Sequence, residues 1–241
     1  MDFNHTRSGP FPETPWTHVR QAGGEDTLAQ TSLEAICRMY WAPLYAFARR
    51  SELTPAEAED VTQAFFAHLL TDQTLTSMDQ SKGRMRSYLL TAMKHFISNW
   101  RRDERTVKRG GRLLRVEFDT SEIEGLCAQQ SGGLSPDAFF ERRWAVTLLD
   151  HALKSLEQEQ AQSGRGEQFT VLSEFLMNHG KDAQHADAAL KLGINEGAAR
   201  VAVHRLRKRY RELVRAHVAA TVGSEEEVED ELRHLLSLYA N

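Results

Sequence analysis

The most regular hydrophobic pattern in the chain lies between residues 187 and 213. It predicts a short helix, a turn at Gly193 and a longer second helix that begins after the favourable N-cap Asn195. Apolar residues step by helical intervals along one face of the second helix: Ala199, Val203, Leu206, Tyr210 and Leu213. Cationic residues occupy its other faces: Arg200, His204, Arg205, Arg207, Lys208, Arg209 and Arg211. This pattern predicts a helix-turn-helix whose second helix fits the DNA major groove, the alternative being a hairpin with a solvated basic face.

Helical spacing also predicts helices over residues 28–50, 55–70, 87–105, 136–162, 169–177 and 224–239. The chain has only six prolines and few β-branched runs, so we expect an all-α protein. The stretch 116–135 is the least periodic, which predicts a linker between two helical domains. The expected parts are an N-terminal extension at 1–27, a first domain at 28–115, the linker at 116–135, a second domain with the helix-turn-helix at 136–222, and an acidic C-terminal helix at 223–241.

The predicted helix that begins at Pro55 has a start signal and a polar face. Thr54 is the expected N-cap, and Glu57 completes a capping box. The core stripe is expected at Val61, Phe65 and Leu69. The remaining polar surface is either solvated or docks a partner, and this helix alone leaves both open: Glu59, Asp60 and Gln63.

The helix predicted over residues 87–105 combines aromatic and basic residues. Its core stripe is expected at Leu89, Met93, Phe96 and Trp100, and its basic side at Lys94, Arg101, Arg102 and Arg105. Arg84 and Arg86 precede it, and basic residues continue to Arg112. Cations beside aromatic rings suit single-stranded or melted nucleic acid, because phosphates attract charge and exposed bases stack. Burial in the core explains the aromatic residues equally well.

The formal net charge of −4 is unusual for a nucleic-acid-binding protein, but the charges are unevenly distributed. Basic residues gather at 94–115 and 196–215, and acidic residues gather at 224–241. The acidic end also has an apolar stripe at Val228, Leu232, Leu235 and Leu236, so we expect it to dock as a helix. The alternative is that it folds onto residues 200–215 and competes with DNA.

Several classes of protein lack a motif here. There is no transmembrane run and no apolar signal core, so we expect a cytoplasmic protein without membrane attachment. Cys37 and Cys127 make no metal-ligand spacing. A phosphate-binding loop and a Gly-x-Ser-x-Gly motif are also missing. We therefore expect no enzymatic activity, no cofactor and no metal.

Three motifs occur in a characteristic order: AEDVTQAFF at 58–66, RSYLLTAMKHF at 86–96, and ALKLGINEGAARVAVHRLR at 189–207. Together they resemble the extracytoplasmic-function (ECF) sigma factors, small members of the sigma-70 family. The resemblance covers roughly residues 28–110 and 140–215. It implies two helical domains that bind bacterial RNA polymerase core and direct it to promoter DNA. An anti-sigma factor is a further candidate partner.

The resemblance also implies three sets of binding residues. The helix that docks on core polymerase carries Glu59, Asp60 and Gln63. The part that captures the melted −10 strand carries Arg84, Arg86, Lys94, Asn99, Arg101 and Arg102. The helix that enters the −35 major groove carries Arg200, His204, Arg205, Arg207, Lys208 and Arg211. Val201 and Ala202 stand where the family often has polar and basic residues, which suggests fewer hydrogen bonds to base edges.

Two other functions compete with a promoter-specificity subunit. One is a stand-alone helix-turn-helix regulator with a helical sensor or dimerisation domain, which would not need an acidic docking helix followed by a basic-aromatic one. The other is a helical interaction protein whose basic faces are only solvated. It would show little salt-dependent DNA affinity, whereas phosphate contacts make affinity fall as salt rises.

Overall fold

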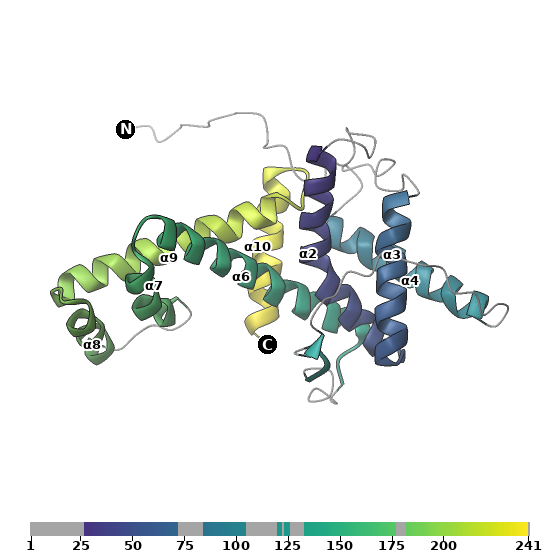
Figure 1. Cartoon of the computed structure of the whole chain (residues 1–241), viewed down its shortest axis with the longest axis horizontal. Coiled ribbons are helices and arrows are strands. Elements are labelled where there is room, and N and C mark those ends of the chain that lie inside the picture. Colours follow the sequence, from purple (N-terminus) through teal and green to yellow (C-terminus); the bar gives the residue numbers. More distant parts are fainter. Residues whose placement is uncertain are drawn as a thin grey trace. The chain divides into compact units, whose positions relative to one another are not determined.

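The secondary structure of the protein is helical (Figure 1). The computed structural model describes residues 27–71, 84–104, 120–121, 123–125, 133–176 and 182–240. Within these ranges there is no β-strand, in agreement with the all-α prediction. None of the helices in them is both long and apolar enough to cross a membrane. Residues 1–26 of the predicted N-terminal extension lie outside the described residues, as does the end of the basic run at residues 105–112.

The contacts divide the chain into two compact units. The first unit contains residues 1–147 and 218–241, and the second contains residues 148–217. The divisions fall within two long helices, α6 (Pro136–Gln162) and α9 (Glu196–Ala219). The sequence had instead predicted a boundary at a linker and a separate C-terminal helix. That helix, α10 (Glu225–Ala240), belongs to the first unit.

The first unit is organised around α2 (Thr27–Arg50), α3 (Pro55–Thr71) and α4 (Met85–Glu104). The apolar stripe of α3 is buried as predicted, at Val61, Phe65 and Leu69. The Trp41 ring of α2 stacks on the Phe66 ring of α3 with centroids 5.8 Å apart. The core is completed by other fully buried side chains, among them Tyr40, Leu44, Tyr45, Leu89, Met93, Phe140 and Trp144.

The buried face of α4 differs from the predicted stripe in its second half. Leu89, Met93 and Ile97 are buried, at successive intervals of four residues. Phe96 and Trp100, which the sequence placed in the core, are half-buried. The Phe96 ring meets the edge of the core with its centroid 5.6 Å from that of Phe65. An interval of four residues slightly exceeds one helical turn, so the buried stripe winds around α4 and leaves these aromatics at its border.

Part of the predicted linker packs on α2. The Ile123 side chain is buried, and Glu124 accepts hydrogen bonds from Tyr45 and Arg49. The Gln-Gln-Ser-Gly-Gly stretch on which the prediction of a linker depended begins at residue 129 and lies almost wholly outside the described residues.

The second unit combines the later part of α6 with α7 (Gly166–Leu172), the 3-10 turn η2 (Ser173–Phe175), α8 (Asp182–Leu192) and most of α9. Its core includes the buried side chains of Leu148, Leu156, Leu172 and Phe175 together with the inner face of α9. The predicted helix at 169–177 thus begins earlier, at Gly166, and changes to a 3-10 turn at Ser173.

Candidate nucleic-acid interface

The polar face of α3 is oriented by the capped start of the helix. Thr54 N donates to Glu57 Oε2 at 2.7 Å, and Glu57 N donates to Thr54 Oγ1 at 3.3 Å, which confirms the predicted capping box. One turn later Gln63 Nε2 donates to Glu59 Oε1 at 3.4 Å. Asp60 is exposed and Glu59 is half-buried, whereas only 9% of Gln63 is exposed. A partner on this face would therefore meet the two carboxylates before the amide.

Four of the six residues predicted to hold melted DNA are exposed on α4: Lys94, Asn99, Arg101 and Arg102. Their contacts come from three helices. Lys94 Nζ lies 2.5 Å from Asp137 Oδ2 of α6, and Arg102 Nη2 donates to Asn99 Oδ1 at 2.6 Å. Arg101 donates to the carbonyl oxygen of Ser51, just after the end of α2. Because these contacts lie at the surface, an anionic ligand can compete with the present partners for the cations.

A groove of about 440 Å³ adjoins these cations within the first unit. Its apolar floor is formed by Phe47 and Ile97, which are buried. Its other lining residues are polar or basic: Ser51, Lys94, Ser98, Arg101 and Arg102. Cations around a small apolar surface suit a nucleotide, because its phosphate and its base need different environments.

The other two predicted residues, Arg84 and Arg86, are paired with carboxylates of other helices. Only 6% of Arg86 is exposed, and its Nε lies 2.9 Å from both carboxylate oxygens of Glu231 in α10. Arg84 Nε lies 3.4 Å from Glu231 Oε1. The burial of Arg86 differs from the solvent-facing position that contact with DNA requires. Sequence reasoning missed Glu231, although its place between Val228 and Leu235 on the apolar stripe was a signal.

The turn and the N-cap that the sequence predicted are present where α8 ends and α9 begins. Gly193 adopts a φ of +63°, which favours glycine, and Ile194 N donates to Ala189 O to close the end of α8. Asn195 caps α9 by accepting a hydrogen bond from Ala198 N at 2.8 Å. The predicted inner stripe of α9 is buried throughout, at Ala199, Val203, Leu206, Tyr210 and Leu213.

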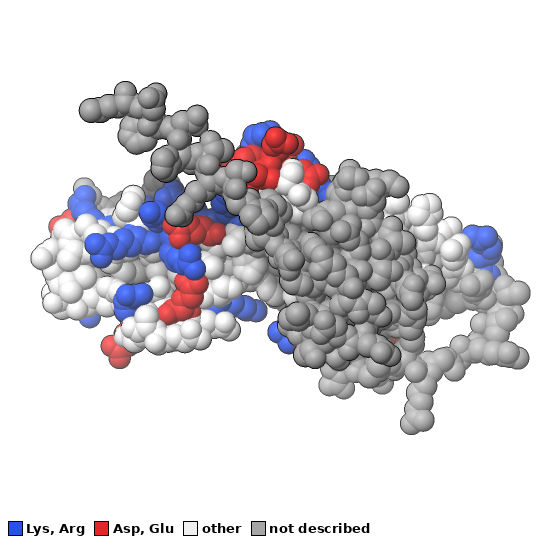
Figure 2. Space-filling model, turned by 90° about the horizontal axis from the view of Figure 1, so that it is seen from above, with Lys and Arg blue, Asp and Glu red and all other residues white. Residues whose placement is uncertain are grey.

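The predicted cationic residues of α9 separate into different surroundings. All but Arg207 are exposed, and four of the exposed ones follow one another at intervals of three or four residues: Arg200, His204, Lys208 and Arg211. Arg207 is half-buried, and its Nε donates to Phe175 O at 2.8 Å. Arg200 Nη2 lies 2.6 Å from Glu196 Oε1. On the left of Figure 2, basic side chains gather with a few acidic ones among them.

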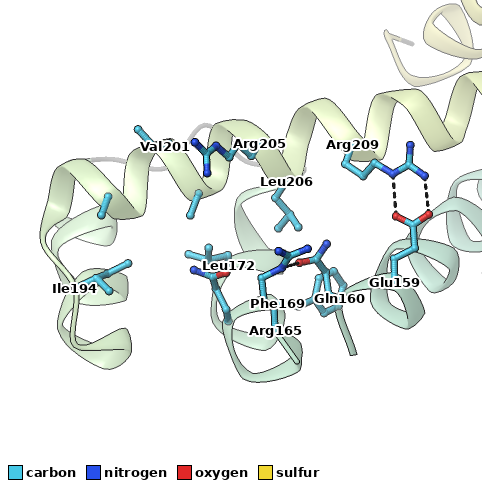
Figure 3. Close-up of a pocket in the computed structure, with 13 residues that line it drawn as sticks. Glu159, Gln160, Arg165, Phe169, Leu172, Ile194, Val201, Arg205, Leu206 and Arg209 are labelled. Atoms are coloured by element: carbon cyan, nitrogen blue, oxygen red, sulfur yellow. Dashed lines mark hydrogen bonds and ion pairs between the residues drawn. The ribbon is translucent and has the colours of Figure 1, made fainter. Parts of the chain in front are cut away.

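Arg205 lines a pocket of about 560 Å³ in the second unit (Figure 3). The pocket lies between α9 and the segment from the end of α6 to α7, and Phe169, Leu172, Ile194 and Leu206 contribute apolar surface to it. Arg209 also lines it, with Nε and Nη2 at 2.8 and 2.7 Å from the two carboxylate oxygens of Glu159. Hydrogen bonding to Arg209 lowers the pKa of the Glu159 carboxyl. Five residues correspond to about 140° around a helix, so Arg205 lies on a different side of α9 from Arg200.

Other chemistry has little support in the described part of the chain. No group of three His, Cys, Asp or Glu side chains there could hold a metal ion. Burial, and to a lesser extent the Glu34 carboxylate, raises the pKa of Cys37 to about 11. Its thiol is therefore protonated at neutral pH, as expected for a partly buried cysteine.

Comparison with known proteins gives one match. Residues 37–107 match the family model for Sigma-70 region 2, which supports a protein of the sigma-70 family. This stretch includes α3, α4 and the predicted residues on both, but it covers less than half of the chain and does not reach α8 or α9. Sigma factors bind RNA polymerase and take part in promoter recognition. No curated protein and no solved structure matches the chain.

Proposed function

We propose that the protein is an ECF-type sigma factor that binds bacterial RNA polymerase core in the cytoplasm and directs it to promoters. The observation that carries this proposal is the match of residues 37–107 to Sigma-70 region 2. In this role the protein performs no bond chemistry. Cationic contacts with phosphates supply affinity, and a few side chains at base edges supply sequence preference. An anti-sigma factor remains a further candidate partner.

In this proposal the first unit serves core binding and strand capture. Glu59, Asp60 and Gln63 on α3 would dock on polymerase. The exposed residues of α4 would hold the melted −10 strand: Lys94, Asn99, Arg101 and Arg102. The groove beside them supports this assignment, since it combines cations with an apolar floor. Because Arg86 is buried, we assign it to holding the fold around α4.

In the same proposal α8, the turn at Gly193 and α9 form a helix-turn-helix for the −35 element. The exposed stripe supports it, because its cations lie on one side of a helix whose opposite face is packed. Arg200, His204, Lys208 and Arg211 would face the major groove, and Arg205 and Arg207 would contribute at its edge. The helix also exposes half of Val201, so an apolar contact with a thymine methyl group is available there.

A stand-alone helix-turn-helix regulator is the alternative, and the features of α8 and α9 support it equally. The two functions are separated by run-off transcription with purified bacterial core polymerase on a library of upstream regions from the protein's own genome. A sigma factor produces discrete start sites that depend on added protein. Salt-sensitive duplex binding without any start site would overturn the proposal and favour the stand-alone regulator.

Substitutions on α9 test whether its exposed stripe is the surface that binds DNA. Lys208→Ala should weaken duplex binding and reduce the salt slope, log affinity against log salt concentration, by about one, as expected for the loss of one phosphate contact. Arg209→Ala is the matched control, because it removes one cation from the same helix on the side that faces the Glu159 carboxylate. If both variants reduce the salt slope equally, DNA does not contact the proposed stripe specifically.

A further inference from the structure

The buried face of α10 carries a carboxylate in the middle of an apolar stripe. Val228 and Leu235 are buried, and Glu231 lies between them on the same face with 1% of its surface exposed. Leu236, which the sequence placed in this stripe, is 67% exposed. A charged side chain in a buried stripe is costly unless an opposite charge compensates it. The predicted docking of the terminal helix is therefore confirmed, but it depends on an ion pair as well as on apolar contacts.

The compensating charge is Arg86, the second residue of α4. Both oxygens of Glu231 accept hydrogen bonds from Arg86 Nε at 2.9 Å. The Arg86 Nη1 group donates to Glu141 Oε1 of α6, and the guanidinium carbon lies 5.2 Å from the centroid of the Trp144 ring. Removing one member of such a buried pair leaves the other charge without its partner, which is strongly destabilising.

The contacts form a closed ring between three helices of the first unit. Arg86 of α4 binds Glu231 of α10 and Glu141 of α6. Glu141 Oε2 in turn lies 3.0 Å from Nε2 of His234, one turn further along α10. Each of the three helices is therefore linked directly to the other two by side-chain hydrogen bonds.

These attachments concentrate on the first residues of α4. Arg84 Nε and Nη2 lie 3.4 Å from Glu231 and 3.5 Å from Asp230 of α10. The Met85 amide donates to the carbonyl oxygen of Thr221 at 3.3 Å, just after the end of α9. Three consecutive residues are thus held by the C-terminal segment 218–240, and the exposed cations of the same helix follow from Lys94 onward.

We propose that α10 is an intramolecular strap that positions α4 for capture of the melted strand, with Glu231 as its positioning residue. This inference rests on the proposed function. In this proposal Glu231 does not contact nucleic acid. It fixes the start of α4, and the later turns of α4 carry the side chains that bind the strand. A shift of α4 would move Lys94, Arg101 and Arg102 together, because they are part of one rigid helix.

At α4, the contacts favour a strap over an inhibitor that covers the cations of this helix. An inhibitor would cover cations that DNA needs, yet Lys94, Arg101 and Arg102 are exposed and bond to α6, α2 and α4. Of the two predicted cations that α10 contacts, Arg84 keeps 29% of its side chain exposed. Arg86 also packs over the buried Trp144 ring and bonds to Glu141. Removal of α10 would take one carboxylate away from Arg86, while its bond to Glu141 and its contact with Trp144 would remain.

The test compares Glu231→Gln with Glu226→Gln in the full-length protein. Both variants remove one carboxylate from α10, but Glu226 is exposed. Promoter opening is measured by permanganate reactivity of the −10 region, and core-polymerase binding by fluorescence anisotropy. For Glu231→Gln we expect opening to fall by roughly tenfold while core binding through α3 changes by less than about twofold, since no contact described above joins α3 to α10. Glu226→Gln should match the parent protein in both.

Comparing the loss of promoter opening with the loss of core binding distinguishes a residue that positions α4 from one that only stabilises the fold. Equal loss of opening and core binding, or no loss of either, would overturn the strap. If Glu231→Gln does not fold by circular dichroism, His234→Ala decides in its place. That variant removes the bond to Glu141 and the ring contact with Trp144, and it should lower opening by about twofold to threefold with unchanged core binding. A parent protein that neither binds core nor opens promoters would instead refute the proposed function.

Discussion

Glu124 offers a sharp test of whether the segment after α4 is part of the first unit. Its Oε1 accepts hydrogen bonds from Arg49 Nε at 2.6 Å and from the Tyr45 hydroxyl at 2.7 Å, and its Oε2 accepts one from Arg49 Nη2 at 3.0 Å. Glu124→Gln removes the charge and replaces one acceptor with a donor that faces the guanidinium. We expect this substitution to lower the free energy of unfolding of the first unit.

The expected loss is about 2 kcal/mol, between two limits. An exposed ion pair contributes about 0–1 kcal/mol. Breaking a fully buried pair costs about 3–5 kcal/mol. The Arg49 and Glu124 side chains are 21% and 28% exposed, so this pair lies between the two cases, and its paired bonds from one guanidinium add geometric strength.

The loss should depend on pH in a defined direction. Hydrogen bonding to Arg49 lowers the pKa of Glu124 below its ordinary value of 4.5, despite the opposing effect of burial. The unfolded chain therefore binds this proton more readily than the folded chain. The stabilisation is complete above about pH 4.5 and is lost as pH falls through the lowered pKa. The difference between the parent protein and Glu124→Gln should shrink accordingly.

Urea unfolding followed by tryptophan fluorescence is the suitable assay, because all four tryptophans lie in residues 1–147 and report on the first unit. Glu34→Gln is the matched control. Its carboxylate also pairs with an arginine of α2, at 3.7 Å, but is 60% exposed, so its loss should cost less than about 0.5 kcal/mol. Equal effects of the two variants at pH 7, or a Glu124→Gln deficit that does not shrink as the pH falls from 7 to 3, would refute the reasoning.

Two further predictions concern the second unit. Burial, and to a lesser extent the neighbouring His151, lowers the pKa of His217, so the folded state resists protonation of this ring. The protein should therefore lose stability as pH falls from 8 to 5.5. Thermal unfolding across that range should show a smaller loss of stability for His217→Gln than for the parent protein, and parallel curves would contradict this cause. Gly193→Ala should lower the free energy of unfolding by about 1 kcal/mol, because φ is +63° there. Gly197→Ala in the first turn of α9 should be neutral or stabilising. Thermal unfolding followed by circular dichroism compares the two variants, and similar melting temperatures would show that a side chain does not strain the turn.

Local features of the fold were readable from the sequence because they depend on residues close together in the chain. The Thr54–Glu57 capping box and the Asn195 cap each involve residues three apart. The inner stripe of α9 follows from helical periodicity alone, and every predicted member is buried. The match to Sigma-70 region 2 agrees with the family that the motifs of the first half suggested.

The candidate binding surfaces were predicted less completely. Composition placed Arg84, Arg86 and Lys94 in one basic group, but the structure buries Arg86, half-exposes Arg84 and exposes Lys94. On α9 the basic group divides between an exposed stripe, a pocket lined by Arg205 and a backbone contact of Arg207. A count of cations cannot separate these cases, because each depends on which other helix lies opposite.

The amino-acid sequence by itself determined the helices, their caps and most of their apolar faces, since these follow from interactions within a few turns. Tertiary structure alone decided where the charges of those helices go. Glu231 and Arg86 are 145 residues apart, and each looks like a surface residue in its own segment. Only packing α10 beside α4 and α6 removes both from water, and in that environment an unpaired charge is too costly to remain. The docking of Glu124 on Arg49, across 75 residues, has the same cause.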